Sequence, residues 1–249
     1  MSDAWYLHWF GEEYLDLYAH RDDSEADRQV DFLVGILRSP PAARFLDTAC
    51  GRGRHVRALA ERGFRSVGID RSASALRIGR ESLTTPNALL LEADMRWPPF
   101  ADSVFDGVLS MFTSFGYFMT DEEHLALLRS WRRVMRLGGS LVIDYLNRPF
   151  VETHLEPYSE AHHGTKLVRL TRQLSPDGSR VEKHIHLEDQ VDGATKTFIE
   201  SVRMYRPSEL GAMLSAAGLS AVGWFGDFSG SPLDDHSERC IVHAERRNG

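Results

Sequence analysis

The sequence predicts an α/β protein with a doubly wound, mostly parallel sheet and an antiparallel β insertion. Between residues 44 and 146, short apolar runs alternate with stretches of helix-forming residues. This alternation is typical of a parallel sheet covered by helices on both faces. A glycine loop follows the first apolar run. Between residues 150 and 206, alternating segments are instead separated by turn residues, which indicates antiparallel strands.

Composition narrows the class of protein. The chain has 249 residues, of which 42% are hydrophobic, enough for one sizeable core with a small insertion. Its formal net charge of -7 gives no general attraction to phosphate backbones and argues against a nucleic-acid partner. Two cysteines, Cys50 and Cys240, cannot form a disulfide framework and favour a reducing compartment. With no membrane-spanning run or secretory leader in view, we expect a soluble, cytoplasmic protein.

The N-terminal residues 1–40 are expected to form a helical cap. Residues 4–20 are rich in aromatic side chains. They either pack against the domain or close over the mouth of a ligand site, because aromatic faces attract cations. Apolar residues recur every three or four positions between 22 and 38, which predicts a helix, and Pro40-Pro41 ends it.

The first strand runs into the glycine loop. Phe45 and Leu46 form a short apolar run that ends in Asp47, and a helix is predicted over 56–61. Between them, Gly51-Arg52-Gly53 would let the backbone approach a ligand, and the helix start would present unpaired N–H groups. The third glycine of a dinucleotide fingerprint is missing. The loop alone therefore indicates only a nucleotide-like ligand.

Further strands also end close to polar residues. They are predicted over residues 66–71, 88–92 and 105–110. Asp70 closes the first of them and follows Asp47 by more than twenty positions, the separation that places an acid on a ribose diol. Asp94 follows the next strand. Carboxylates at successive strand ends are much harder to obtain by chance than one glycine loop.

On these residues the chain resembles the class I S-adenosylmethionine-dependent methyltransferases. Residues 47–53, Asp-Thr-Ala-Cys-Gly-Arg-Gly, are similar to the first motif of that family, Asp70 to its ribose acid, and Asp94-Met95 to its adenine-contacting pair. Ala49 stands where the family often has a glycine, and alanine still permits a tight turn. The resemblance implies a Rossmann-like methyltransferase fold that binds S-adenosyl-L-methionine. The residues predicted to contact this cofactor are Tyr14, Tyr18, Asp47, Ala49, Gly51, Gly53, His55, Asp70, Arg71, Asp94, Met95 and Met111.

An aromatic stretch, residues 110–118, follows the fourth strand and carries no charge. It is either core packing beneath a lid or, as a similar run in relatives of sugar N-methyltransferases implies, part of the acceptor site. A helix is then predicted over 121–137 with a capping box at its start, and a fifth strand over 140–146. Because ligands bind beyond the carboxyl ends of such strands, Tyr117, Tyr145 and Asn147 are the predicted catalytic residues.

The predicted insertion covers residues 150–206, with a hairpin turn at Pro176-Asp177-Gly178. Residues 41–149 and 207–249 would then form the cofactor-binding domain. In the methyltransferase family such insertions form substrate lids or dimer contacts, so a homodimer through the insertion is one expectation. Several of the eleven histidines cluster near or in it, but spacing alone is poor grounds for a metal site, and we predict none.

The leading functional hypothesis is methyl transfer to a small-molecule acceptor, with the acceptor atom (N, O, S or C) left open. One alternative is a protein or RNA methyltransferase. The acidic composition disfavours RNA as the substrate. Another is a catalytically silent protein that binds S-adenosylmethionine without using it.

Overall fold

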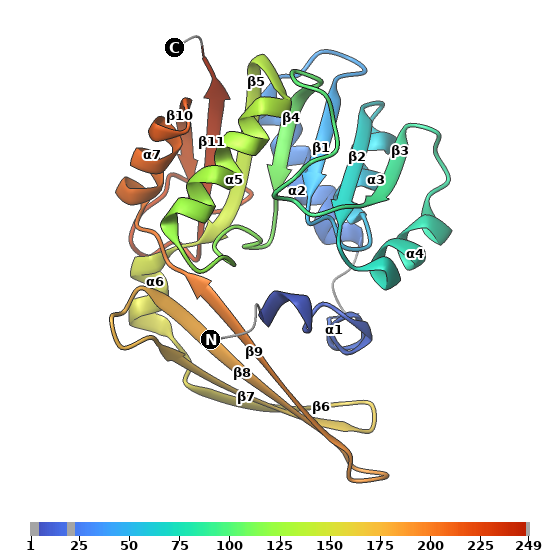
Figure 1. The fold of residues 1–249 in the computed structure, drawn as a ribbon, viewed down its shortest axis with the longest axis vertical. Helices are drawn as coiled ribbons and strands as arrows, with labels where there is room; N and C mark the ends of the chain where they lie inside the picture. Colours follow the sequence, from blue (N-terminus) through green and yellow to red (C-terminus); the bar gives the residue numbers. More distant parts are fainter. Residues whose placement is uncertain (1–4, 19–22, 248–249) are drawn as a thin grey trace.

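The computed structural model describes residues 5–18 and 23–247. Its centre is a seven-stranded sheet (Figure 1). The strands are β1 (Arg44–Thr48), β2 (Arg65–Asp70), β3 (Ala88–Glu92), β4 (Phe105–Ser110), β5 (Met135–Leu146), β10 (Leu219–Phe225) and β11 (Arg239–Arg246). Their spatial order is β10-β11-β5-β4-β1-β2-β3. β11 pairs antiparallel with both β10 and β5, and the other neighbouring strands pair in parallel, so the predicted mostly parallel sheet is confirmed.

Helices cover both faces of this sheet, as predicted. They are α2 (Asp23–Leu37), α3 (Arg54–Glu61) and α4 (Ala73–Ser82) on one face, and α5 (Asp121–Val134) and α7 (Pro207–Ala216) on the other. On the α2 side, Leu33 and Leu59 are fully buried in one hydrophobic cluster. On the α5 side, Trp131 and Leu210 belong to a second cluster. Each helix therefore buries its apolar stripe against the sheet.

Two helices begin at side-chain caps. Ser72 precedes α4, and its Oγ accepts a hydrogen bond from the backbone N–H of Ala75 at 3.3 Å. Thr120 precedes α5 and forms the predicted capping box with Glu123. Such caps satisfy backbone N–H groups that have no partner within the helix.

The predicted end of α5 is wrong. The helix stops at Val134, and Met135 already belongs to β5, where it pairs with Phe105 of β4. Arg136 adds an ion pair to Asp106, with 2.7 Å between Nη1 and Oδ1. These contacts hold the chain alongside β4, so the glycine pair expected to end the helix lies within the irregular start of the strand instead.

The insertion forms a second sheet, antiparallel and of order β6-β7-β8-β9. Its strands are β6 (Tyr158–His163), β7 (Lys166–Leu174), β8 (Arg180–Asp189) and β9 (Thr195–Arg203), and α6 (Arg148–His154) leads into it. The hairpin turn at Pro176-Asp177-Gly178 is confirmed, since the backbone N–H of Ser175 donates to the Arg180 carbonyl at 2.9 Å. Neither α6 nor β6 was predicted.

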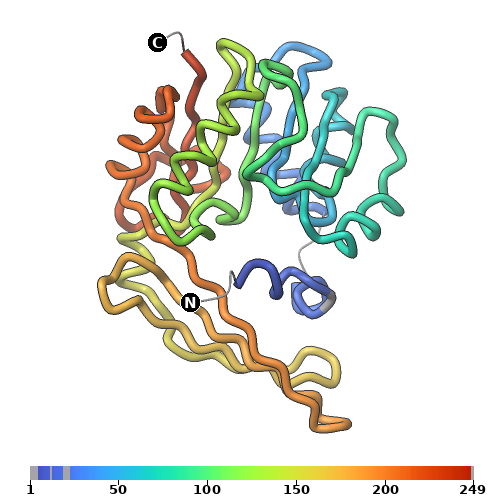
Figure 2. The backbone as a smooth tube through the Cα atoms, in the orientation of Figure 1, coloured from blue at the N-terminus to red at the C-terminus, as the bar shows by residue number. Residues whose placement is uncertain are grey.

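The N-terminal segment lies between the insertion sheet and the carboxyl ends of the parallel strands (Figures 1 and 2). It consists of a 3-10 turn, η1 (Trp5–Leu7), and a short helix, α1 (Glu12–Leu17). Trp9, only 1% exposed, packs with Val168 and Ile185 of the insertion. Part of the aromatic surface of this segment therefore packs on the insertion sheet. Residues 1–4 and 19–22 of the predicted cap lie outside the described residues.

Candidate functional site

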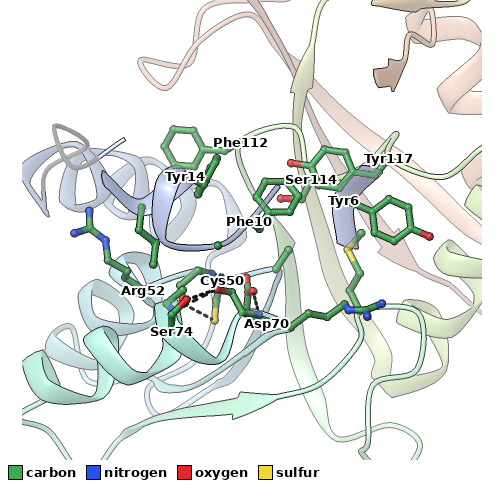
Figure 3. Close-up of a pocket in the computed structure, with 18 of the residues that line it drawn as sticks. Tyr6, Phe10, Tyr14, Cys50, Arg52, Asp70, Ser74, Phe112, Ser114 and Tyr117 are labelled. Carbon is green, nitrogen blue, oxygen red and sulfur yellow. Dashed lines mark hydrogen bonds between the residues drawn. The ribbon is translucent and has the colours of Figure 1, made fainter. Parts of the chain in front are cut away.

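A cavity of about 450 Å³ lies at the carboxyl ends of β1, β2 and β4, beneath the N-terminal segment (Figure 3). In an open α/β sheet this is where ligands bind. All of the residues predicted to contact the cofactor line this cavity except Gly53. The predicted acceptor residue Tyr117 lines it as well.

Gly53 was predicted to contact the cofactor, but it does not line the cavity. It is the N-cap residue of α3, with a left-handed φ of 74°. A Cβ atom there would lie 2.7 Å from the Leu90 side chain on β3, which is too close. Gly53 thus permits close packing of α3 on the sheet. Gly51, with φ of 55°, and Ala49, with φ of 58°, form the tight loop that borders the cavity.

Asp70, at the end of β2, is oriented by backbone groups. Its Oδ2 accepts from the N–H of Gly51 at 2.7 Å, and its Oδ1 accepts from the N–H of Ser72 at 2.8 Å. Burial raises the pKa of Asp70, and these hydrogen bonds partly offset that effect. Asp70 lines the cavity, where its carboxylate oxygens can accept hydrogen bonds from hydroxyl donors of a ligand.

Asp47, at the end of β1, is buried without any hydrogen bond to its carboxylate within the described part of the chain. Burial, reinforced by the charge of Asp70, raises its pKa from the ordinary value of 3.8 to about 8. His55 Nδ1 lies 3.8 Å away, and His55 Nε2 is 2.7 Å from Gln29 Oε1. Burial lowers the pKa of His55 to about 3. An unsatisfied buried carboxylate facing a cavity suits a cationic ligand group.

Asp94, after β3, is held by two arginines. Arg96 Nη2 and Arg71 Nη1 lie 2.7 Å and 3.0 Å from Asp94 Oδ2. Burial opposes ionisation of Asp94, but the hydrogen bonds from Arg96 outweigh it and lower the pKa. The Arg96 guanidinium also lies over the Phe118 ring, 5.1 Å from its centroid. Arg96 therefore connects the end of β3 to the opposite wall of the cavity.

That opposite wall is aromatic. Figure 3 shows Phe10, Tyr14, Phe112 and Tyr117 on the side of the cavity away from Asp70. The Tyr117 ring stacks on Phe10 with 5.5 Å between centroids, and Phe10 meets Tyr14 edge-on at 4.9 Å. The cavity thus has one side of carboxylates, backbone groups and arginines and another side of aromatic rings, whose faces attract positive charge.

Two of the predicted catalytic residues are not brought to the cavity. Tyr145 is fully buried on the α5 side of the sheet, where its hydroxyl donates to the Arg203 carbonyl of β9. Asn147 is 1% exposed, and its Nδ2 donates to the carbonyls of Asp234 and Ser237 at 2.8 Å and 2.7 Å. Both side chains connect elements of the fold, and we no longer assign them to the acceptor.

Sequence reasoning missed several lining residues. Four of them are Ser72, Ser74, Arg54 and Arg52. Their place in the sequence could have indicated them, because each of these residues lies within a few positions of a correctly predicted strand end. Phe10 lay within the aromatic N-terminal stretch but was not singled out among its aromatic residues.

Residues 5–18 and 23–247 contain no group of three or more His, Cys, Asp or Glu side chains placed to hold a metal ion. Over the same ranges, every helix is too short or too polar to cross a membrane.

Comparisons with known proteins bear on the chemistry of this cavity. Residues 45–139 match the family model described as a methyltransferase domain. A cypemycin N-terminal methyltransferase from Streptomyces sp is 30% identical over 207 residues, which cover 81% of this chain and 82% of the relative. A dTDP-3-amino-3,4,6-trideoxy-alpha-D-glucopyranose N,N-dimethyltransferase from Streptomyces venezuelae is 28% identical, covering 73% of this chain and 77% of the relative. The CcbJ methyltransferase from Streptomyces caelestis shares the fold, with a TM-score of 0.81 at 19% identity over 96% of this chain and 98% of that structure.

Proposed function

The chain belongs to the class I S-adenosylmethionine-dependent methyltransferases, and from that premise we propose that it methylates an amine nitrogen of a small-molecule acceptor. The observation that carries the proposal is the aromatic wall formed by Phe10, Tyr14 and Tyr117 opposite the carboxylates of the cavity. The relatives quoted above support it, since their names place the methyl group on an amine of a peptide or an amino sugar.

The residues of the cavity fit the cofactor. S-adenosyl-L-methionine supplies a methyl group that is activated by attachment to a sulfonium. We assign Asp70 to the ribose hydroxyls, because its two oxygens are already aimed by Gly51 and Ser72. Asp47 would be the counter-ion for the amino group, because its buried oxygens have no other hydrogen-bond donor within the described residues. Met95 and Asp94 line the cavity and would border the adenine.

The aromatic wall favours an amine over a hydroxyl acceptor for an electrostatic reason. When a neutral amine accepts a methyl group, a positive charge appears on nitrogen as the charge on sulfur disappears. Ring faces such as those of Phe10 and Tyr117 stabilise positive charge at both atoms. A hydroxyl acceptor would instead need a base to take its proton early.

Tyr117 is the one predicted catalytic residue that we retain. It follows β4 and lines the cavity. We propose that its ring orients the acceptor, because methyl transfer is an in-line displacement in which alignment supplies most of the catalysis. The N-terminal segment, with Tyr14 and Tyr18, would close the cavity over the bound pair.

A matched pair of acceptors tests the amine assignment. Purified protein is incubated with methyl-labelled S-adenosylmethionine and either a nucleotide-linked 3-amino sugar or its 3-hydroxy counterpart, and products are analysed by mass spectrometry. We expect label on the amino sugar alone. Transfer to the hydroxyl compound alone would overturn the proposal. Cofactor binding without transfer to any member of a wider amine panel would favour the silent-binding alternative.

Two coarser properties complete the proposal. We infer a reducing, cytoplasmic setting from the free thiols of Cys50 and Cys240. We also propose that residues 150–206, as a unit, supply any contact between two copies of the chain, while residues 1–40 act as the cap. Gel filtration of the full chain, compared with a variant carrying charge reversals on β6, would test the dimer.

A further inference from the structure

A buried arginine connects the insertion sheet to the loop that carries Tyr117. Arg180 is the first residue of β8 and is 8% exposed. Its Nε donates to Ser201 Oγ at 2.8 Å, and its Nη2 donates to the Ser201 carbonyl at 2.7 Å. The other contacts reach across to the loop after β4. Nη1 donates to the carbonyl of Phe118 at 3.0 Å, and Nη2 to that of Gly116 at 3.4 Å.

The burial of this guanidinium is costly. Among the described residues no carboxylate lies within ion-pair distance of Arg180; its hydrogen bonds go to carbonyl and hydroxyl oxygens. Burial lowers the pKa of its guanidinium. A buried charge without a counter-ion is tolerated only where fixed dipoles replace water around it. The carbonyls of Gly116 and Phe118 are such dipoles. The charge of Arg180 therefore needs this loop conformation, and the loop is in turn held by Arg180.

The loop is fitted closely to the insertion at the same point. Gly116 has φ of 101°, and a Cβ atom there would lie 2.9 Å from Val202 Cγ1 and 3.0 Å from the Arg203 carbonyl oxygen. Its own carbonyl accepts from the Arg203 N–H at 2.9 Å as well as from Arg180. Gly116 thus joins the loop to the last strand of the insertion, and Arg180 spans from there to Phe118.

We propose that Arg180 is a positioning residue for the acceptor: by holding the carbonyls on either side of Tyr117, it sets where the Tyr117 ring stands in the cavity. The ring lies between Phe10 and Trp5, with centroids 5.5 Å and 4.9 Å away. A loop released at Gly116 and Phe118 would let the ring shift relative to the cofactor side of the cavity. The inference rests on the proposed function only for the identity of the acceptor.

The test compares Arg180→Met and Arg180→Lys with Arg172→Met. Arg172 lies on β7 of the same sheet and donates to Ser159 Oγ at 3.1 Å, within the insertion, so its variant removes a guanidinium without touching the loop. Lysine at 180 keeps the charge but lacks the fork that reaches two carbonyls. If Arg180→Met does not fold, Arg180→Lys alone tests the inference.

The first readout is hydrogen–deuterium exchange with S-adenosylhomocysteine bound. We expect exchange in the peptide containing residues 116–118 to rise about tenfold in Arg180→Met and less in Arg180→Lys, while calorimetry gives an unchanged Kd for S-adenosylhomocysteine. Arg172→Met should match the unaltered protein in both. Unchanged exchange in both Arg180 variants, or loss of S-adenosylhomocysteine binding in step with exchange, would overturn the inference.

The second readout is kinetic and uses the amine with the fastest turnover in the panel above. Arg180→Met should lower kcat/KM for that amine about tenfold or more, with partial rescue by Arg180→Lys. Normal kcat/KM in a variant whose loop exchanges freely would refute the positioning role. Faster exchange in the loop together with transfer only to hydroxyl acceptors would contradict the amine assignment and leave the role of Arg180 supported.

Discussion

The carboxylate of Asp144, on β5, accepts a hydrogen bond from the backbone N–H of Phe112 at 2.9 Å. Phe112 and Thr113 have φ of 54° and 61°, a left-handed conformation that bulky residues rarely adopt. Arg239 Nε donates to the same carboxylate at 2.7 Å, and its Nη2 donates to Thr113 Oγ1 at 3.0 Å. The strained loop beside the cavity is therefore held by an ion pair anchored in the sheet.

Removing this anchor should destabilise the protein. Asp144→Ala leaves Arg239 without its counter-ion and the Phe112 N–H without its acceptor, so we expect the free energy of unfolding to fall by about 3 kcal/mol. Urea denaturation measures it. The control is Asp102→Ala, which removes an exposed ion pair to Arg133 and should cost less than about 1 kcal/mol. Equal losses in the two variants would mean that Asp144 does not hold the loop.

Asp70→Asn should weaken cofactor binding. The amide keeps the size of the side chain but loses the charge that strengthens hydrogen bonds to ribose hydroxyls, a loss of about 1.5–3 kcal/mol, or tenfold or more in Kd. Calorimetry with S-adenosylhomocysteine provides the measurement, and thermal denaturation checks that the fold persists. An unchanged Kd would show that Asp70 only holds the Gly51 loop.

The raised pKa of Asp47 leads us to expect that the free energy of unfolding depends on pH. Its pKa is about 8 in the folded protein and near 3.8 when unfolded, so the folded state binds more protons between these values. The stability that this difference contributes is fully present below about pH 4 and is lost as pH rises through 8. The change is on the order of 1 kcal/mol per pH unit.

The comparison with Asp47→Asn isolates this effect, because His55 and Arg54 are common to both proteins. We expect the wild-type free energy of unfolding, relative to that of Asp47→Asn, to decrease steadily from pH 5 to pH 8 without cofactor. A difference that stays constant over this range would show that Asp47 is ionised throughout in the folded protein.

Trp9→Ala should release the N-terminal segment. The Trp9 ring lies 4.6 Å from the Phe198 ring, and its Nε1 donates to Glu200. Truncating a buried tryptophan typically lowers the free energy of unfolding by about 3–5 kcal/mol. In this protein the loss falls on the contact between the N-terminal segment and the insertion. We expect faster limited proteolysis within residues 5–18 and a weaker Kd for S-adenosylhomocysteine. Trp97→Ala is the control, since Trp97 is 74% exposed. Proteolysis as slow as in that control would argue against a cap held by Trp9.

The carboxylates of the cavity could be predicted because topology alone brings strand ends together. Asp47, Asp70 and Asp94 each follow an apolar run, and parallel strands bring such positions to one edge. The residues proposed to contact the acceptor were harder to predict. Successive residues of a strand point to opposite faces, and nothing in the local sequence shows that β9 covers Tyr145. Asn147 is likewise enclosed by a loop almost ninety residues later in the chain.

The insertion shows a second limit. Its longer strands alternate apolar and polar residues, which the sequence displays. β6 (Tyr158–His163) carries mostly polar side chains, so its sequence does not show an apolar alternation. It is a strand because its backbone pairs with β7. Arg180, which reaches out of the insertion to the cavity wall, gave no sequence signal, because its partners are backbone carbonyls of a distant loop.

A crystal structure with S-adenosylhomocysteine and an amino sugar bound tests the central claim most directly. The account predicts the ribose hydroxyls on Asp70, the amino group of the cofactor product beside Asp47, and the acceptor nitrogen between the sulfur and the Tyr117 ring. A structure in which the adenosyl group lies away from Asp70, or in which a hydroxyl rather than the amine of the sugar faces the sulfur, would contradict it.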